Sequence, residues 1–332
     1  MKEIKKINLQ LFAGNPNTNV TTDSGLSVEN KTHYDMTLID EASPLLVHDQ
    51  FGQKRPIPKN GGKKIEFRKY ASFPKATTPL TEGVTPDGRK LSVTAIEAEV
   101  EQYGDYVVLS DVLDLTAIDN NVVEATKACG RQAGLTGDTI TRNVLQSGTN
   151  VFYVGGGTSR STLTAADKLT VAMVKRVVAY LKACNAPKID GSYVAIIHPY
   201  AAHDIMSDPE WIDAHKYATP ENIYEGEIGK VAGVRFVETS EAAIFTGDEC
   251  PAGLSVFGTL FIAAGAYGVT EITGGGLQTI IKQLGSAGTA DPLNQRSSVG
   301  WKFIKTAEIL VDAYLVRVES CTSFSAEVDE AN

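Results

Sequence analysis

The chain has 332 residues, of which 42% are hydrophobic and 21% charged, and its 31 basic and 40 acidic side chains give a net charge of −9. This composition excludes disordered, collagen-like and coiled-coil sequences and allows one large or two smaller domains with an extensive core. The acidic balance argues against a surface devoted to nucleic acid, because neutralising phosphates needs clustered cations.

The cysteines and the hydropathy pattern exclude further classes. No CxxC motif or Cys/His cluster occurs, so we expect neither a zinc site nor a disulfide framework but reduced, mostly buried thiols. No apolar run approaches the roughly 18 residues of a membrane span, and the opening MKEIKKINLQLFAG is too polar for a secretory signal. We therefore expect no membrane association. The four cysteines are Cys129, Cys184, Cys250 and Cys321.

Charge is unevenly distributed along the chain. Residues 1–90 carry a net charge of +4, whereas residues 91–332 carry −13. Within residues 51–75 eight basic side chains accompany a single acidic one, Glu66. Two interpretations stay open at this point: a solvated basic strand and loop, or a basic projection that lies on the acidic body of another copy.

The first third of the chain predicts extended structure. Residues 14–32 are polar and rich in Asn, Thr and Gly, which indicates an arm outside the core. From Lys63 to Val108 apolar and polar residues alternate, interrupted by TTPLTEGVTPDGRK, a stretch rich in turn-forming residues. This pattern predicts a long two-stranded hairpin with a flexible tip. Because an isolated hairpin is marginal in water, we expect it to lie on something.

Two amphipathic helices are expected next. A stripe of apolar or small residues after Ser110 predicts a long helix. Thr164 and Asp167 resemble a capping box that would start a second helix, whose stripe is Met173, Val174, Val177 and Leu181. The stripe of the first helix consists of Val122, Ala125, Cys129, Ala133, Gly137, Ile140 and Val144.

The second half of the chain is rich in predicted strands, so the expected class is α+β. YVAII at Tyr193–Ile197 is a continuous apolar run, typical of a central buried strand. Further strands are expected at Gly233–Thr239 and Leu254–Ile262, and the triple glycine 274–276 marks an expected boundary. The end predicts strands in LQTIIKQL, WKFIKT and EILVDAYLVRVES, the last with Ile309, Val311, Ala313 and Leu315 on one face and Arg317 as a candidate fifth member.

The search for catalytic chemistry finds no site. His198 and His203 are five apart, about 140° of helical rotation, so they do not share a face as a metal-binding pair would. Asp111 and Asp114 are what a helix N-terminus favours. No P-loop, GxGxxG or GxSxG motif is complete. We predict no catalytic residues, no metal and no cofactor.

Four local stretches, together with the order of elements, resemble tailed-phage major capsid proteins. The specific resemblance is to a coat-protein family of podoviruses and prophages with the Hong Kong 97-type fold. It implies an α+β capsid fold with an N-terminal arm, an extended β-hairpin loop, a spine helix, and peripheral and axial domains. The stretches are NLQLFAG (Asn8–Gly14), VAIIHP (Val194–Pro199), GVRFVET (Gly233–Thr239) and GSAGTADPLNQRSSVGW (Gly285–Trp301).

The resemblance also implies a division of the chain and a role for its basic residues. The expected segments are an N-terminal arm (1–50), the extended loop (51–100), a peripheral domain with the spine helix (101–164), an axial domain (165–276) and a return to the peripheral β region (277–332). If the hairpin lies on neighbouring subunits, the charge split becomes complementary. The residues then expected in intersubunit salt contacts are Lys54, Arg55, Lys63, Lys64, Arg68 and Lys69.

The implied function is that of a major capsid protein, which assembles in many copies into an icosahedral shell around double-stranded DNA. The implied partners are other copies in hexamers and pentamers, a scaffolding protein, a portal and a decoration protein, and the DNA is enclosed without sequence recognition. The expected location is the virion, after assembly in the host cytoplasm. Two alternatives stay open: an encapsulin-like nanocompartment shell and a cytosolic α/β enzyme, for which the strand that ends at His198 is the main support.

Overall fold

The structure is a computed structural model, and it describes residues 46–70, 73–80, 82–85, 87–116, 120–216, 229–286, 291–328 and 330–332. The expected arm over residues 14–32 and the NLQLFAG stretch lie outside these residues. Across the described part of the chain, no helix is long and apolar enough to cross a membrane.

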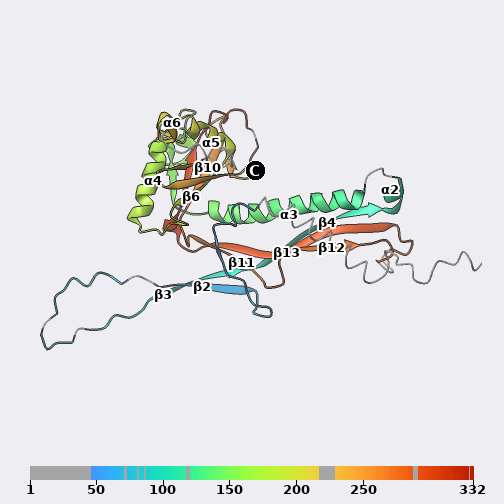
Figure 1. Ribbon diagram of the computed structural model, residues 1–332, viewed down its shortest axis with the longest axis horizontal. Helices are drawn as coiled ribbons and strands as arrows, with labels where there is room; N and C mark the ends of the chain where they lie inside the picture. Colours follow the sequence, from blue (N-terminus) through green and yellow to red (C-terminus); the bar gives the residue numbers. More distant parts are fainter. Residues whose placement is uncertain are drawn as a thin grey trace, which may run out of the picture.

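A long five-stranded sheet and one helix form the extended part of the molecule (Figure 1). The central strand β13 pairs with β4 along one edge and with β11 and β12 along the other, all antiparallel, while β1 adds to β11 in parallel. The elements are β1 (Gln53–Lys54), β4 (Glu101–Ser110), α2 (Asp111–Thr116), α3 (Asn121–Gln146), β11 (Tyr267–Glu271), β12 (Gln278–Lys282) and β13 (Arg296–Ile309).

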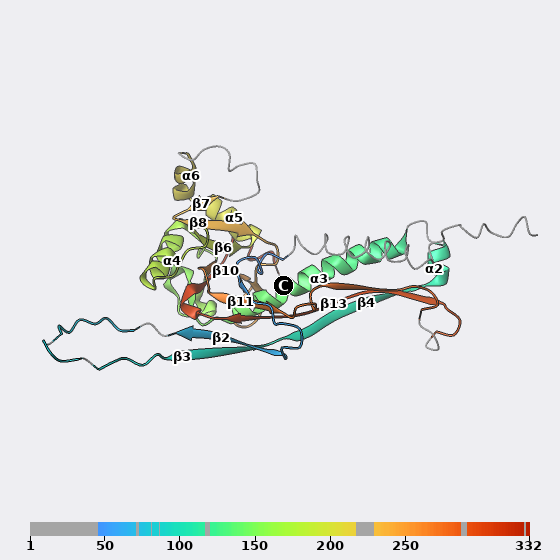
Figure 2. The same ribbon diagram turned by 60° about the horizontal axis from the view of Figure 1, so that its bottom comes forward.

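Helix α3 lies along this sheet over its whole length (Figures 1 and 2). The Asn120 side chain caps its N-terminus by accepting from the backbone of Val123. Cys129 and Ala133 are buried against Trp301 and Phe303 of β13, so the centre of the predicted stripe is confirmed.

In the second half of α3 the predicted stripe is confirmed at Gly137 but not at its last two positions. Ile140 and Val144 are only half-buried, whereas Asp138 and Leu145 are fully buried. The reason is that residues 46–52 pack onto this half of the helix through both polar and apolar side chains. The apolar stripe of the helix alone does not reveal such a contact.

The other part of the molecule is a seven-stranded sheet covered by helices. The predicted strand Tyr193–Ile197 is confirmed as β6, fully buried between an antiparallel neighbour, β10, and a parallel one, β8. The strands are β5 (Val151–Tyr153), β6, β7 (Lys230–Val231), β8 (Val234–Glu238), β9 (Ile244–Phe245), β10 (Val256–Ile262) and β14 (Leu315–Ser320). The helices are α4 (Val171–Ala183), α5 (Pro199–Met206) and α6 (Pro209–Lys216), with short 3₁₀ turns η3 (Val154–Gly156), η4 (Arg160–Thr162) and η7 (Asp312–Tyr314).

The predicted face of α4 is confirmed but its predicted start is wrong. All four residues of the stripe are buried in the core of this part. The Asp167 carboxylate does accept from the backbone and hydroxyl of Thr164, both at 2.8 Å. That contact closes a turn, and the helix begins only at Val171, because Thr170 caps it by accepting from Met173.

The prediction of one continuous strand over EILVDAYLVRVES is also wrong. Strand β13 ends at Ile309 in the five-stranded sheet, the 3₁₀ turn η7 follows, and β14 then pairs with β10 in the other sheet. The alternation of residues 309–317 therefore belongs to two strands in two sheets. The chain also passes from one sheet to the other between β10 and β11, and a small core around Leu145, Leu260 and Tyr267 joins the two parts.

The long hairpin is confirmed over residues 64–99, but the remainder of the predicted run up to Val108 belongs to β4, which pairs with β13 in the five-stranded sheet. Strands β2 (Lys64–Tyr70) and β3 (Val93–Glu99) pair antiparallel over seven positions and form a two-stranded sheet of their own. The hairpin projects from the base of the five-stranded sheet in the direction away from α2 (Figures 1 and 2). All described residues between Phe73 and Ser92 are exposed.

Candidate functional site

The hairpin is attached to the body through its base. Phe67 of β2 is 4% exposed and packs against Gly268 of β11. On the adjacent strand Ala98 is buried as well, and Val100, which follows β3, donates its backbone N–H to the carbonyl of Lys63 at 3.0 Å. An aromatic anchor and the buried Ala98 therefore hold the base of a projection whose described residues beyond Phe73 face solvent.

Strand β1 and the residues after it fix the segment that leads into the hairpin. Arg55 donates its backbone N–H to Val269 at 3.2 Å, and Ile57 donates to Glu271 at 2.8 Å. The guanidinium carbon of Arg55 lies 5.8 Å from the centre of the Phe67 ring, a distance compatible with a cation–π contact. These bonds place Arg55 beside the aromatic anchor, whereas Lys54 lines a cleft that does not include Phe67.

The two faces of the hairpin carry different charges. On the outer face Lys64 and Arg68 alternate with Glu66, and Glu97 and Glu99 of β3 lie opposite. Lys64 pairs with Glu97 at 3.6 Å, and Arg68 pairs with Glu66 at 3.2 Å. The hydrogen bonds that the Arg68 guanidinium donates to Glu66 raise its pKa. The acids of β3, absent from the count over residues 51–75, thus balance the basic residues on this face.

The other basic side chains lie at the base of the hairpin and in the segment that leads into it. Lys69 has the same strand parity as the buried Phe67, and Lys63 precedes β2. For Lys54, Lys63 and Lys69 the described residues show no ion pair. Of the six residues expected in salt contacts, the structure therefore pairs two inside the chain and leaves at least three available to another molecule.

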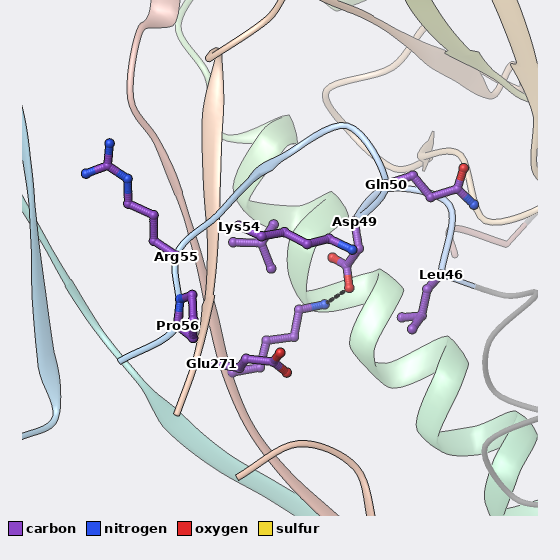
Figure 3. A pocket seen from close by; sticks show the side chains of 9 residues that line it. Leu46, Asp49, Gln50, Lys54, Arg55, Pro56 and Glu271 are labelled. Carbon is purple, nitrogen blue, oxygen red and sulfur yellow. Dashed lines mark hydrogen bonds and ion pairs between the residues drawn. The ribbon is translucent and has the colours of Figure 1, made fainter. Parts of the chain in front are cut away.

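Two clefts flank the aromatic anchor. The larger, of about 310 Å³, lies between β1 and α3 (Figure 3). Asp49 and Lys305 form an ion pair inside it, and Lys305 also donates to the carbonyl of Gly137 at 2.8 Å. In this view Arg55 points away from the other labelled side chains. The cleft is lined by Leu46, Asp49, Gln50, Lys54, Arg55, Pro56, Val269, Glu271 and Lys305.

The smaller cleft, of about 150 Å³, lies between the hairpin and the loops before β11 and after β13. Arg55, Arg68 and Lys69 contribute to its lining, together with Phe67. No acidic residue lines it. Four of the six predicted basic residues are thus brought together at the two clefts, whereas Lys63 and Lys64 line neither.

A buried polar cluster beside the larger cleft was not predicted. His48 and Asp138 are fully buried, with Nδ1 and Oδ2 2.6 Å apart, and the backbone N–H of His48 donates to the same carboxylate at 2.7 Å. Thr141 donates its hydroxyl to Asp49 at 2.5 Å. These contacts fasten residues 46–52 to α3. Their partners are about 90 positions apart in the sequence, so no local pattern signals them.

His198, the residue that supports the enzyme alternative, has a structural role in this fold: it caps a helix. His198 caps α5, and its Nδ1 accepts from the backbone of Tyr200 at 3.2 Å. Burial lowers the pKa of His198 to about 4, which keeps the ring neutral and able to accept. Within the described ranges no group of three or more His, Cys, Asp or Glu residues could hold a metal ion. The side chain of Asp114 is outside the described residues.

The cysteines match the sequence-based expectation. Cys129, Cys250 and Cys321 are buried thiols and Cys184 is half-buried. Burial raises the pKa of the Cys321 thiol to about 11 and also raises that of Cys250. These thiols are therefore protonated at neutral pH and poorly suited to nucleophilic chemistry.

The arrangement around the hairpin base can instead bind charged or extended protein segments.

Comparisons with known proteins identify the architecture. A family model described as phage capsid protein matches residues 47–264. A search of curated proteins finds no match. Among solved structures, the capsid of Ralstonia phage GP4 superposes with a TM-score of 0.65 at 15% identity, covering 83% of this chain and 88% of that one.

Two cyanophage capsids are similar to the same extent. The capsid of cyanophage P-SCSP1u has a TM-score of 0.65 at 13% identity and covers 84% of this chain and 89% of its own. The capsid of cyanophage Pam1 has a TM-score of 0.65 at 12% identity and covers 84% and 92%. These likenesses confirm the fold that the resemblance implied, the Hong Kong 97-type α+β capsid fold.

Proposed function

The chain belongs to the phage capsid protein family, and on that premise we propose how its parts serve a shell. It is a major capsid protein of a tailed phage, one that forms the shell of the particle in many copies. Membership of this family implies a structural, non-enzymatic role and a location in the virion.

The proposal that the hairpin makes the contacts between copies is carried by one observation. Among the described residues the hairpin is attached at its base alone, yet it exposes large apolar side chains beyond it: Tyr70 is 60% exposed, Phe73 53%, Leu80 77% and Leu91 66%. Such residues at the end of a two-stranded ribbon are stable in water only when another surface covers them. In a shell, the adjacent subunit is that surface.

The basic residues support a second feature of this contact. Lys54, Arg55, Lys63, Lys64, Arg68 and Lys69 would make salt contacts with the acidic body of a neighbouring copy. Because Lys64 and Arg68 already pair within the hairpin, Lys54, Lys63 and Lys69 are the strongest candidates. Each exposed ion pair stabilises by at most about 1 kcal/mol, so the effect depends on repetition over many copies.

The proposed division of the chain into domains is based on its two sheets. We propose that the five-stranded sheet with α3 is the peripheral domain with its spine helix and that the seven-stranded sheet is the axial domain. Residues 1–50 would form the arm and residues 51–100 the extended loop. In this arrangement the axial domains meet in hexamers and pentamers, and the hairpins connect neighbouring subunits.

The shell would enclose double-stranded DNA without sequence recognition. A net charge of −9 is compatible with a container that packs DNA and later releases it, because tight wall contacts would need clustered cations. The further partners we propose are a scaffolding protein, a portal and a decoration protein. Assembly would take place in the host cytoplasm.

Electron microscopy of the expressed protein tests the function directly. The chain would be produced alone and with a candidate scaffolding protein from the same phage, then imaged in negative stain and sized by light scattering. Closed shells, or hexamer and pentamer rings, are the expected result. A monomer or dimer under every condition would contradict the proposed function. Shells much smaller than a virion would favour a nanocompartment, and turnover of a small molecule would favour an enzyme.

A further inference from the structure

Strand β4 has an unpaired edge. It pairs with β13 at ten consecutive positions, from Glu101 opposite Lys305 to Ser110 opposite Arg296. On its other edge, no strand among the described residues pairs with it. A ten-residue strand therefore presents one row of backbone donors and acceptors that no described strand uses, although the N–H of Tyr106 in this row donates to the carboxylate of its neighbour Asp105 at 2.8 Å.

Two hydrogen bonds show which residues supply this row. Val100 donates its N–H to Lys63 beside β2, whereas Asp111 donates to Gln295 beside β13, both at 3.0 Å. Successive N–H groups of an extended strand point in alternate directions, and residues 100 and 111 differ in parity. Odd-numbered residues of β4 thus face β13, and even-numbered ones face the unpaired edge.

Close backbone approaches support the same parity. A Cβ at Gly104 would lie 2.6 Å from the carbonyl oxygen of Trp301, and one at Gly300 would lie 2.7 Å from the Cβ of Tyr106. Such close approaches are typical of the narrow, non-hydrogen-bonded pairs of an antiparallel ladder, in which both residues direct their N–H and C=O groups outward. The outward-facing donors of β4 therefore include Gln102, Gly104, Tyr106 and Val108.

Exposed apolar side chains accompany this edge. Tyr106 is 68% exposed and Val108 50%, and in the helix that follows Leu113 is 45% and Leu115 84% exposed. A long strand edge flanked by such residues invites pairing with another chain unless something covers it. The edge and the apolar residues together form a surface suited to an added strand.

We propose that the unpaired edge of β4 accepts strand β2 of a second copy, which adds to the five-stranded sheet. The inference rests on the proposed function and deepens it by naming the two strands that meet. Strand β2 also has one edge that no described strand pairs with, because it is bonded only to β3. The Val100 to Lys63 bond sets its parity: residues 65, 67 and 69 face β3, and residues 66 and 68 donate outward.

Charge favours this pairing of strands. Strand β2, KIEFRKY, carries three basic residues and one acidic residue, whereas β4, EQYGDYVVLS, carries two acidic residues and no basic one. Cross-strand pairs of opposite charge stabilise a sheet by about 0.2–1 kcal/mol each. Main-chain hydrogen bonds would provide the affinity and these side chains the selectivity, as in other cases of strand addition.

A pair of proline substitutions tests the edge. Val108→Pro removes an N–H that the described chain does not use, so we expect a folded protein, with a thermal midpoint near that of the wild type, that forms at least tenfold fewer shells. Val107→Pro removes a bond to β13 and should lower the thermal midpoint clearly. Val108→Thr, which keeps the N–H, should assemble like the wild type. A Val108→Pro protein that assembles normally would overturn the proposal.

Hydrogen exchange on the wild type gives a second test that depends on no variant. In shells, compared with unassembled chains, exchange should slow at least tenfold at Gly104 and Val108 of β4 and at Glu66 and Arg68 of β2. Odd-numbered amides of β4 should be protected in both states. Unchanged exchange in shells overturns the proposal, as does protection already present in the unassembled chain, which would mean that the chain covers its own edge.

The outcomes separate this inference from the proposed function. If the wild type forms shells but the even-numbered amides of β4 stay unprotected, the function stands and strand addition is wrong. If β4 gains protection and β2 does not, another segment occupies the edge and the assignment to β2 is wrong. If the wild type forms no assembly under any condition, both proposals fail.

Discussion

The ring of Phe67 lies where a side chain on residue 268 would be: a Cβ at Gly268 would come within 2.8 Å of the ring carbon Cζ. Phe67 is on the hairpin and Gly268 is on β11, about 200 positions away in the sequence. The absence of a side chain at 268 is thus what allows the hairpin to seat against the body. This contact is the main apolar anchor of the projection.

Removing the ring should loosen the hairpin. We expect Phe67→Ala to lower the free energy of unfolding by about 3 kcal/mol and to speed amide exchange in β2 and β3, because a buried aromatic contact is replaced by a cavity. Thermal unfolding and hydrogen exchange of the unassembled protein measure both effects. The matched control is Phe73→Ala, since Phe73 is 53% exposed and its removal should change stability by less than about 0.5 kcal/mol. Equal effects of the two variants would contradict the anchor.

A buried ion pair in the other part of the molecule gives a second prediction. Arg160 holds the fully buried Glu319 in a bidentate contact, with both hydrogen bonds at 2.8 Å, and its guanidinium lies 3.7 Å from the centre of the Phe245 ring. Arg160→Ala removes both hydrogen bonds but leaves Arg317, whose Nε lies 3.0 Å from the same carboxylate, so we expect a loss of about 2–3 kcal/mol in the free energy of unfolding.

Urea denaturation of the unassembled protein measures this loss. Arg160 also contacts Glu249 at 3.3 Å, but Glu249 is 86% exposed. Glu249→Gln should therefore cost less than about 1 kcal/mol, since exposed ion pairs contribute little. Comparable costs for the two variants would mean that the buried contact is not the stabilising one.

What the sequence predicts well is what depends on local pattern. The continuous apolar run Tyr193–Ile197 identifies the central strand, because a strand buried on both faces consists of apolar residues throughout. Alternation after Lys63 identifies the hairpin, because a strand buried on one face alternates apolar and polar residues. The coat-family resemblance adds the overall fold.

What the sequence does not predict depends on partners far along the chain. The buried side chain of Asp138 contacts His48, 90 positions away, and that of Glu319 contacts Arg160, 159 positions away, as well as the nearby Arg317. The break after Ile309 is hidden for a related reason: strands of two different sheets follow one another with compatible alternation. The charge balance of the hairpin also depends on pairing, because the acidic side chains of β3 lie opposite the basic ones of β2 only in the folded hairpin.

Stability should depend on pH through His198. Burial lowers its folded pKa to about 4, below the value near 6.5 of an unfolded histidine. The unfolded state therefore binds a proton first as the pH falls, so stability is full above about pH 6.5 and declines between there and pH 4, by about 3 kcal/mol from this residue.

His198→Asn tests this dependence. Asparagine also caps helices but does not titrate, so the variant should stay folded at pH 7 and lose less stability on acidification than the wild type. Urea midpoints of unassembled protein at pH 7 and pH 5 make the comparison. If both proteins show the same drop, the pH dependence comes from other groups.

Charge reversal on the hairpin tests the proposed salt contacts. The triple variant Lys54→Glu, Lys63→Glu, Lys69→Glu changes the three basic residues for which the described chain shows no ion pair. It should fold with an unchanged thermal midpoint but form at least tenfold fewer shells, because each copy then repels the acidic body of its neighbour. Shell yield in negative stain and circular dichroism of the unassembled protein measure the two effects.

The matched control changes basic residues at positions outside the hairpin. Lys175 pairs with Glu210 at 2.7 Å on the surface of the other part of the molecule, and Lys127 pairs with Glu124 at 3.0 Å on α3. Lys127→Glu with Lys175→Glu should affect assembly less than the hairpin variant. The difference should shrink at high ionic strength, where salt screens exposed charges over about 3 Å at 1 M. If the triple variant assembles as the wild type does at low salt, the basic residues make no contribution and the apolar surface of the hairpin alone holds the copies together.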